Sequence, residues 1–154
     1  MDLKPFDSFI FDLGGTLLAI ADDEIALDAA GRVTVLPGVV PALRALRGRP
    51  LFVVTNQQGV ALGSIGAAQA HGFVAQLDGA LGGLITDHRI CMHRADAGCP
   101  CRKPRPGMLH DLAKVHGLNL ARALYVGDSE SDRRCAAAAG LGTFLWAADF
   151  FTAR

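Results

Sequence analysis

The amino-acid sequence predicts an α/β fold, a Rossmann-like three-layer sandwich with a mostly parallel central sheet. Two observations predict it. Short apolar segments of strand-forming residues alternate along the chain with longer segments in which apolar residues recur at helical spacing. The chain of 154 residues is also long enough to bury one substantial core. Because it has no linker, internal repeat or low-complexity tract, we expect a single domain over residues 1–154.

Five strands are expected, in short segments rich in the aliphatic and aromatic residues that suit strands. They lie near Ser8–Asp12, Leu51–Thr55, Leu84–Cys91, Ala123–Gly127 and Thr143–Leu145. Helices are expected at roughly Val39–Arg47, Ala67–Leu81, Pro106–His116 and Ser131–Ala139. The second helix carries its apolar residues on one face, and a proline is well placed to begin the third. The last strand and its packing would include Phe144, Trp146, Phe150 and Phe151.

The segment 19–36 separates the first strand from the first helix and is too short to be a second domain. The pairs Asp22-Asp23 and Gly31-Arg32 mark turns, and Val33-Thr34-Val35 could form one strand of a small hairpin. We therefore expect this segment to form a flap over the turn that follows the first strand.

Composition narrows the classes of function. The formal net charge is +0 and there is no basic block, which argues against nucleic acid as the main partner. No apolar stretch approaches the ~18 residues needed to span a bilayer, and the N-terminal residues lack the design of a secretion signal. We expect a soluble, cytoplasmic and monomeric protein whose partner is a small molecule.

Polar side chains follow three of the predicted strands. Asp12 ends the first strand at a turn made by Gly14-Gly15, Thr55-Asn56-Gln57 ends the second, and Asp128 follows the fourth. Ligands bind at the carboxyl ends of the strands in open parallel sheets, so these residues should converge. Asp12 and Asp128 would offer hard oxygen ligands to Mg²⁺. Thr55 and Asn56 would donate to a phosphoryl group, and Lys103 would supply positive charge.

Four segments resemble, in the same order, the four motifs of the haloacid dehalogenase superfamily. They are Phe11-Asp12-Leu13-Gly14-Gly15-Thr16-Leu17, Val54-Thr55-Asn56-Gln57, Arg102-Lys103-Pro104 and Val126-Gly127-Asp128-Ser129-Glu130-Ser131-Asp132. Within the superfamily the chain is similar to the branch of subfamily IIIA that contains histidinol-phosphate phosphatase and the heptose bisphosphate phosphatases. The resemblance implies a capless fold, because neither 19–36 nor 91–101 leaves room for a cap domain.

The resemblance implies a role for each matching residue. Asp12 would attack phosphorus and become an aspartyl phosphate, which is covalent catalysis. Thr55 and Lys103 would stabilise the charge on the transferring phosphoryl group. Thr55 and Lys103, together with Asn56 and Arg102, would also bind the substrate.

The resemblance also implies a Mg²⁺ site. Asp12, the backbone carbonyl of Gly14 and Asp128 would be its ligands, and Asp132 would support them from behind or through a water molecule. The resulting expectation is a Mg²⁺-dependent phosphatase acting on a small phosphomonoester.

One position departs from the pattern of the phosphatases in this superfamily. They carry a second Asp, the general acid and base, two positions after the nucleophile, and here that position is Gly14. General acid–base help is typically worth ~10²–10⁴-fold, so turnover is expected to be slow. The flap residues Asp22, Asp23 and Glu24 are conceivable substitutes. The alternative hypothesis is a catalytically impaired binding module for a phosphorylated ligand or a protein partner.

A second cluster of chemically competent residues lies at 91–101. Cys91, His93, Cys99 and Cys101 offer three thiolates and one imidazole, the ligand set of a closed structural zinc site. The alternative is three buried thiols beside an unrelated histidine. Because Arg102 and Lys103 directly follow the last of these residues, zinc would anchor them without taking part in chemistry.

The same loop resembles that phosphatase branch but leaves the substrate open. The short gap between His93 and Cys99 is similar to the histidinol-phosphate members, whereas residues 103–108 are similar to the heptose bisphosphate members. A sugar phosphate, a sugar bisphosphate and histidinol phosphate all remain candidates.

Overall fold

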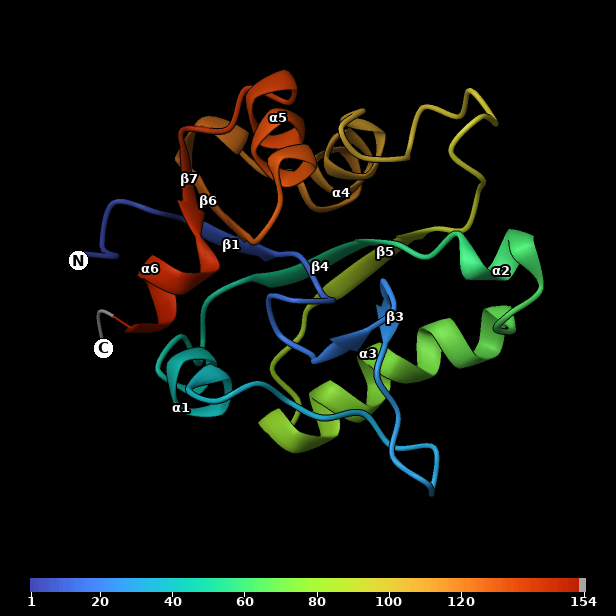
Figure 1. Ribbon diagram of the computed structural model, residues 1–154. Helices are drawn as coiled ribbons and strands as arrows, with labels where there is room; N and C mark the ends of the chain where they lie inside the picture. Colours follow the sequence, from blue (N-terminus) through green and yellow to red (C-terminus); the bar gives the residue numbers. More distant parts are fainter. Residues whose placement is uncertain (153–154) are drawn as a thin grey trace.

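The structure, a computed structural model, describes residues 1–152 and is built around a five-stranded sheet (Figure 1). The sheet order is β5-β4-β1-β6-β7, and every neighbouring pair is parallel. The strands are β1 (Ser8–Phe11), β4 (Leu51–Asn56), β5 (Asp87–Cys91), β6 (Ala123–Gly127) and β7 (Thr143–Trp146). The predicted Rossmann-like parallel sheet is confirmed. The last two residues of the predicted domain 1–154 lie outside the described residues.

Helices cover both faces of this sheet (Figure 1). One face is covered by α1 (Val39–Arg44), α3 (Ala67–Leu81) and α6 (Ala147–Thr152), and the other by α4 (Gly107–His116) and α5 (Glu130–Ala138). Successive strand residues point to opposite faces. Phe9 and Phe11 accordingly pack into the first layer, and Ile10 packs into the second. The three layers are those expected from the alternating sequence pattern. Two short helices, α2 (Gly59–Leu62) and the 3-10 helix η1 (Leu120–Arg122), were not predicted.

The predicted strand at 84–91 is shorter in the structure. It begins at Asp87, because the amides of Leu84 and Ile85 donate to the side chain of Asp78, at 2.8 and 2.9 Å, in place of a neighbouring strand. A side chain of the preceding helix α3 therefore holds these two residues outside the sheet.

The C-terminal aromatic residues also differ from the prediction. Phe144 and Trp146 lie in β7, as expected, whereas Phe150 and Phe151 belong to a helix, α6, that was not predicted. Both rings pack on Phe11, with centroids 5.6 and 6.4 Å away, so the helix covers this face of β1.

The segment 19–36 forms the expected flap, but its hairpin lies earlier than predicted. The hairpin consists of β2 (Ile20–Ala21) and β3 (Glu24–Ile25), which pair antiparallel. Asp22 and Asp23 form its two-residue turn with φ angles of 51° and 62°. Positive φ at both positions is what the tightest hairpin turns require, and Asp tolerates it better than most residues.

Val33 and Val35 do not form a hairpin strand. They make isolated bridges to Leu27 and Leu18, so this part of the flap runs back alongside its own beginning. Among the residues that the structure describes, no helix is both long enough and apolar enough to cross a membrane.

Candidate active site

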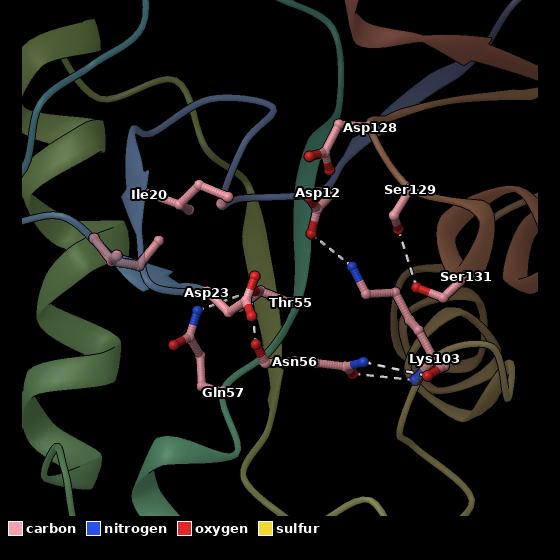
Figure 2. A pocket seen from close by; sticks show the side chains of 12 residues that line it. Asp12, Ile20, Asp23, Thr55, Asn56, Gln57, Lys103, Asp128, Ser129 and Ser131 are labelled. Atoms are coloured by element: carbon pink, nitrogen blue, oxygen red, sulfur yellow. Dashed lines mark hydrogen bonds and ion pairs between the residues drawn. The ribbon is translucent and has the colours of Figure 1, made fainter.

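Asp12 and Asp128 follow the two central strands, β1 and β6, at the point where the strand order reverses. Phe11 is the partner of Val126, and the amide of Asp12 donates to the Val126 carbonyl at 3.0 Å. The two carboxylates therefore leave the sheet next to one another, as Figure 2 shows. Such a switch point is where open α/β sheets bind their ligands.

A pocket of about 250 Å³ opens over these carboxylates. The flap hairpin contributes one part of its wall, and the turn after β6 contributes another (Figure 2). Its lining comprises Asp12, Gly14, Ile20, Asp23, Ile25, Thr55, Asn56, Gln57, Lys103, Asp128, Ser129 and Ser131.

Thr16 joins the two carboxylates. Its hydroxyl lies 3.1 Å from Oδ2 of Asp12 and 3.2 Å from Oδ1 of Asp128. Gly15 makes the approach of Asp128 possible, because a Cβ there would lie 2.1 Å from a carboxylate oxygen of Asp128. Carboxylate oxygens of Asp12, Asp128 and Asp132 all lie within 4.8 Å of one another. The spacing fits a single hard cation with ligand distances of about 2–2.6 Å.

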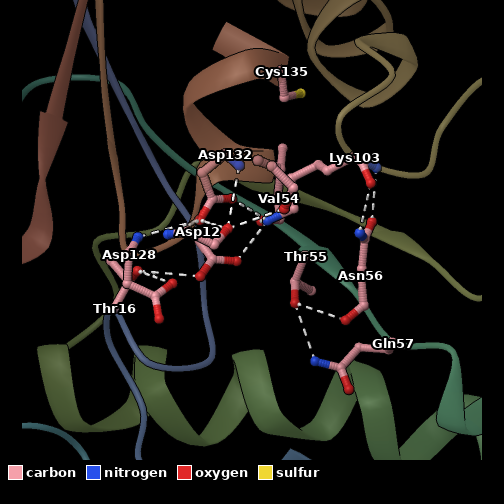
Figure 3. A network of polar contacts seen from close by, with 12 residues as sticks. Asp12, Thr16, Val54, Thr55, Asn56, Gln57, Lys103, Asp128, Asp132 and Cys135 are labelled. Carbon is pink, nitrogen blue, oxygen red and sulfur yellow. Dashed lines mark hydrogen bonds and ion pairs between the residues drawn. The ribbon is translucent and has the colours of Figure 1, made fainter. Parts of the chain in front are cut away.

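Lys103 is buried beside Asp12 (Figure 3). Its Nζ lies 2.6 Å from Oδ1 of Asp12 and 2.7 Å from Oδ1 of Asp132, and it also donates to the Val54 carbonyl at 3.2 Å. Burial by itself lowers the pKa of Lys103, but the two carboxylates outweigh burial and raise it. Lys103 therefore stays charged and can neutralise a phosphoryl group next to Asp12.

Burial has the opposite effect on Asp12. Burial, helped by the charge of Asp132 and opposed by Lys103, raises the pKa of this carboxyl to about 7. Attack on phosphorus requires the ionised form, and a divalent cation beside Asp12 favours that form. The all-oxygen donor set fits a Mg²⁺ ion at this place.

Asp132 is held from all sides. Its Oδ2 accepts hydrogen bonds from the amides of Asp128 and Ser129, both at 3.2 Å, and its Oδ1 accepts one from the Tyr125 hydroxyl at 2.8 Å. With Ser129 it forms the capping box that begins α5. Burial raises the pKa of Asp132, but Lys103 and hydrogen bonds from the hydroxyls of Ser129 and Tyr125 outweigh burial and lower it. Asp132 thus fixes Lys103 and the turn that carries Asp128, which suits the supporting position predicted for it.

Asn56 differs from its predicted role. Its amide oxygen accepts from the Lys103 amide at 3.0 Å, and its amide nitrogen donates to the Lys103 carbonyl at 3.2 Å. Both ends of the side chain therefore contact the backbone of Lys103, so Asn56 positions Lys103, and its role as a donor to a phosphoryl group stays a prediction. Thr55 is buried in the same pocket, where its hydroxyl oxygen accepts from the Gln57 amide at 3.1 Å.

Arg102 lies outside this pocket. It lines a neighbouring cavity of about 510 Å³, which shares Asp23, Asn56 and Gln57 with the first. Its Nη1 is buried without a hydrogen-bond partner among the described residues. The structure thus brings Asp12, Thr55, Lys103 and Asp128 together and leaves Arg102 one cavity away.

Gly14 is covered by the flap. A Cβ at this position would lie 2.9 Å from Cγ2 of Ile20 and 3.2 Å from Cδ1 of Ile25. The hairpin therefore occupies the space into which a side chain at residue 14 would extend.

The predicted zinc ligands converge as well. Neighbouring ligand atoms of Cys91, His93, Cys99 and Cys101 are 3.1 to 3.7 Å apart, and His93 presents its Nδ1. About 3.8 Å is expected between sulfur ligands of a tetrahedron with Zn–S bonds of ~2.3 Å. The pKa of the Cys99 thiol is lowered to about 6, because hydrogen bonds from the amides of Arg102 and Cys101 and from the other thiols outweigh burial. The donor set and spacing fit zinc.

Sequence reasoning missed two residues of the site. Thr16 lies inside the first quoted motif, and its hydroxyl could have been found as the polar group one turn after Asp12. Tyr125 sits in a fully buried strand, and a buried tyrosine hydroxyl requires a partner. That requirement was the signal, although nothing in the sequence pairs Tyr125 with Asp132.

Known proteins resemble this chain over most of its described length. A model of the haloacid dehalogenase-like hydrolase family matches residues 19–140. A D-glycero-beta-D-manno-heptose-1,7-bisphosphate 7-phosphatase of Rhodopseudomonas palustris is 35% identical over 125 residues, which are 73% of this chain and 69% of that protein. A D-glycero-alpha-D-manno-heptose-1,7-bisphosphate 7-phosphatase of Mycobacterium bovis is 38% identical over 115 residues, 68% of this chain and 60% of that protein.

The alignments therefore span about two thirds or less of the curated relatives' own lengths. Among solved structures, the D,D-heptose 1,7-bisphosphate phosphatase of B. bronchiseptica, complexed with magnesium and phosphate, is similar with a TM-score of 0.82. Its sequence identity is 32%, and the match covers 91% of this chain and 80% of that one. The family model covers most of the chain and the fold matches this solved structure, so the chain belongs to the haloacid dehalogenase-like hydrolase family.

Proposed function

We propose that this protein is a Mg²⁺-dependent phosphatase that hydrolyses a small phosphomonoester through an aspartyl phosphate at Asp12. The observation that carries the proposal is the buried arrangement around Asp12. One carboxylate oxygen lies 2.6 Å from Nζ of Lys103, and the other is joined through Thr16 to Asp128. This arrangement supports the assignment of Asp12 as nucleophile, Lys103 as fixed positive charge and Asp128 as a second carboxylate ligand of a cation.

The residues would divide the reaction as follows. Lys103 and Thr55 hold the phosphoryl oxygens while Asp12 attacks phosphorus and the ester oxygen leaves. Water then attacks the same phosphorus, which releases phosphate and returns the Asp12 carboxylate. Mg²⁺ held by Asp12, Asp128 and the carbonyl of Gly14 would supply charge neutralisation. Asp132 and Asn56 act indirectly, because they position Lys103.

The relatives favour sugar bisphosphates as the class of substrate. They are named for both anomers of a heptose 1,7-bisphosphate. A bisphosphate needs a second positive group at a distance from the first, and Arg102 meets this need beside the adjoining cavity. Histidinol phosphate, which the zinc loop alone left open, lacks a second phosphate and is the weaker candidate. The expectation of a cytoplasmic monomer is kept.

The zinc site is proposed as a structural clip. Its first ligand is tied to the end of β4, since the Gln57 amide donates to the Cys91 carbonyl at 2.7 Å. Its last ligand directly precedes Arg102-Lys103. Holding both ends fixes the loop that delivers Lys103, so zinc would act on catalysis through position alone.

A phosphatase screen tests the proposal. Purified protein is assayed for phosphate release from sugar monophosphates, sugar 1,7-bisphosphates and histidinol phosphate, with Mg²⁺ and after its removal by chelation. We expect release that depends on Mg²⁺ and is fastest with a bisphosphate. A folded protein that hydrolyses none of them but binds inorganic phosphate in a titration would support the alternative binding module, which the absence of a carboxyl at Gly14 favours.

A further inference from the structure

We propose that Asp23, at the tip of the flap hairpin, is the general acid and base of this active site. The proposal rests on the phosphatase activity proposed above. It replaces the carboxyl that Gly14 cannot supply with one from a different element of the fold.

The pocket leaves one carboxylate uncommitted. Three carboxylates line it, those of Asp12, Asp23 and Asp128. Asp12 is paired with Lys103, and Asp128 is tied to Thr16 and to the expected cation. Among the described residues, none forms a hydrogen bond or ion pair with the side chain of Asp23. Asp23 is therefore free to exchange a proton with a ligand in the pocket.

The other flap carboxylates are placed differently. Glu24 accepts a hydrogen bond from the Ser64 hydroxyl at 2.6 Å, which holds its side chain away from Asp12. Asp22 and Glu24 line the neighbouring cavity but not the pocket over Asp12. Only Asp23 of these three lines both cavities. The geometry thus separates candidates that the sequence left equal.

The hairpin that carries Asp23 is seated on Gly14 itself. Ile25 is buried in the core, and Ile20 and Ile25 lie 2.9 and 3.2 Å from where a Cβ of residue 14 would be. A side chain at residue 14 would have to displace the side chains of Ile20 and Ile25, which belong to the strands on either side of Asp23. Gly14 therefore leaves room for the hairpin that carries Asp23.

Each half-reaction then balances. In the first half, the carboxylate of Asp12 forms a bond to phosphorus as the bond between phosphorus and the ester oxygen breaks. The electron pair of the broken bond goes to the ester oxygen, which receives the proton of Asp23. In the second half, ionised Asp23 takes a proton from water as the water oxygen attacks phosphorus. The bond between Asp12 and phosphorus breaks, its electrons return to Asp12, and Asp23 is protonated again.

The test compares Asp23→Asn with Asp22→Asn on two phosphomonoesters in the presence of Mg²⁺. Asn tolerates the left-handed backbone of the turn, so both variants keep the hairpin and each removes one charge. One substrate is the sugar phosphate that the wild type hydrolyses fastest, whose alkoxide leaving group needs a proton. The other is p-nitrophenyl phosphate, whose phenolate leaves without one.

For Asp23→Asn we expect kcat on the sugar phosphate to fall about 10²–10⁴-fold, with little change in KM. On p-nitrophenyl phosphate the fall should be at least ~10-fold smaller, because only the help to the attacking water is lost. Asp22→Asn should keep the wild-type ratio of the two rates. Equal losses on both substrates, or no loss, would overturn the role of Asp23 while the phosphatase stands. A wild type silent on both would overturn the phosphatase itself.

Discussion

Gly14 has a larger effect on this site than the loss of one carboxyl. Its backbone would accept a side chain, since it does not lie in the left-handed region, so the obstacle to substitution is Ile20 of the hairpin. This obstacle is a packing contact, and a packing contact can be relieved by a second substitution.

We expect Gly14→Asp alone to lower the melting temperature, because overpacking of this kind costs about 1–3 kcal/mol. Gly14→Asp/Ile20→Ala should recover most of this loss, since it removes the nearest side-chain atom. In an Asp23→Asn background the double substitution should raise kcat on a sugar phosphate by up to ~10²–10⁴-fold, because a carboxyl returns beside Asp12. Thermal melts and steady-state rates measure both effects, with Ile20→Ala as the control. An unchanged melting temperature for Gly14→Asp would contradict the packing argument.

At the scale of elements, the loop from β5 to α4 connects the zinc ligands with Lys103. None of the four cysteines of the chain forms a disulfide, and three of them lie beside His93 in this loop. Cys135 is the exception, since it lies in α5, buried, and donates to the Arg105 carbonyl at 3.4 Å. The chain thus offers a matched pair of buried cysteines, one inside the cluster and one outside.

Cys99→Ser should remove zinc and destabilise the fold, because structural zinc contributes folding free energy. For a chain of this size ~1 kcal/mol corresponds to about 2–4 °C, so we expect a loss of ~5 °C or more. Metal analysis should find one zinc per wild-type chain, none in Cys99→Ser and one in Cys135→Ser, whatever the last variant loses in stability. A zinc-free wild type would show that these residues are only buried thiols.

The carboxylate of Asp87 also links strand β5 to helix α4. Asp87 lies 2.7 Å from Nε2 of His116 and 2.8 Å from Nη1 of Arg89. Burial raises the pKa of Asp87, but hydrogen bonds from His116 and Arg89 outweigh it, and the pKa falls to about 2. Because the folded pKa lies below the unfolded value of ~3.9, folding favours the charged form.

The stability from Asp87 is therefore fully present above about pH 4 and is lost as the pH falls through about 2. Asp87→Asn should be less stable than wild type by up to ~1 kcal/mol at pH 6, since the pair is partly exposed. The difference should shrink steadily between pH 4 and pH 2.5. Urea unfolding at these pH values measures it, and the exposed Asp149→Asn serves as a control with little change. A difference that grows toward low pH would have the wrong sign.

At the scale of the whole molecule, the sequence predicts the sheet and the site more completely than it predicts the flap. Asp12 and Asp128 could be placed together because parallel strands present their carboxyl ends at one edge, whatever the intervening loops do. Ala67–Leu81 has the predicted bounds, since its apolar face and the Gly82 that ends it are local signals. The cysteine cluster could likewise be predicted from the spacing of its residues along the sequence.

Other features depend on contacts that no local pattern encodes. The strands at Ile20–Ala21 and Glu24–Ile25 are two residues long, too short for an alternating pattern, and form because the hairpin packs on Gly14. Asn56 could not be assigned, because its partner is the backbone of Lys103. Asp23 could not be distinguished from Asp22 either, because the difference is that Asp23 also lines the pocket over Asp12.

The central claim is that Asp12 is the nucleophile of a phosphatase, and Asp12→Asn tests it most directly. The measurement is phosphate release by wild type and by Asp12→Asn, side by side with Mg²⁺, on the substrate that the wild type hydrolyses fastest. Melting curves and zinc content establish that both proteins are folded. We predict release by the wild type and none above background by Asp12→Asn, because an amide oxygen is too weak a nucleophile to form the aspartyl phosphate. A folded Asp12→Asn protein that releases phosphate within about tenfold of the wild-type rate would contradict the account.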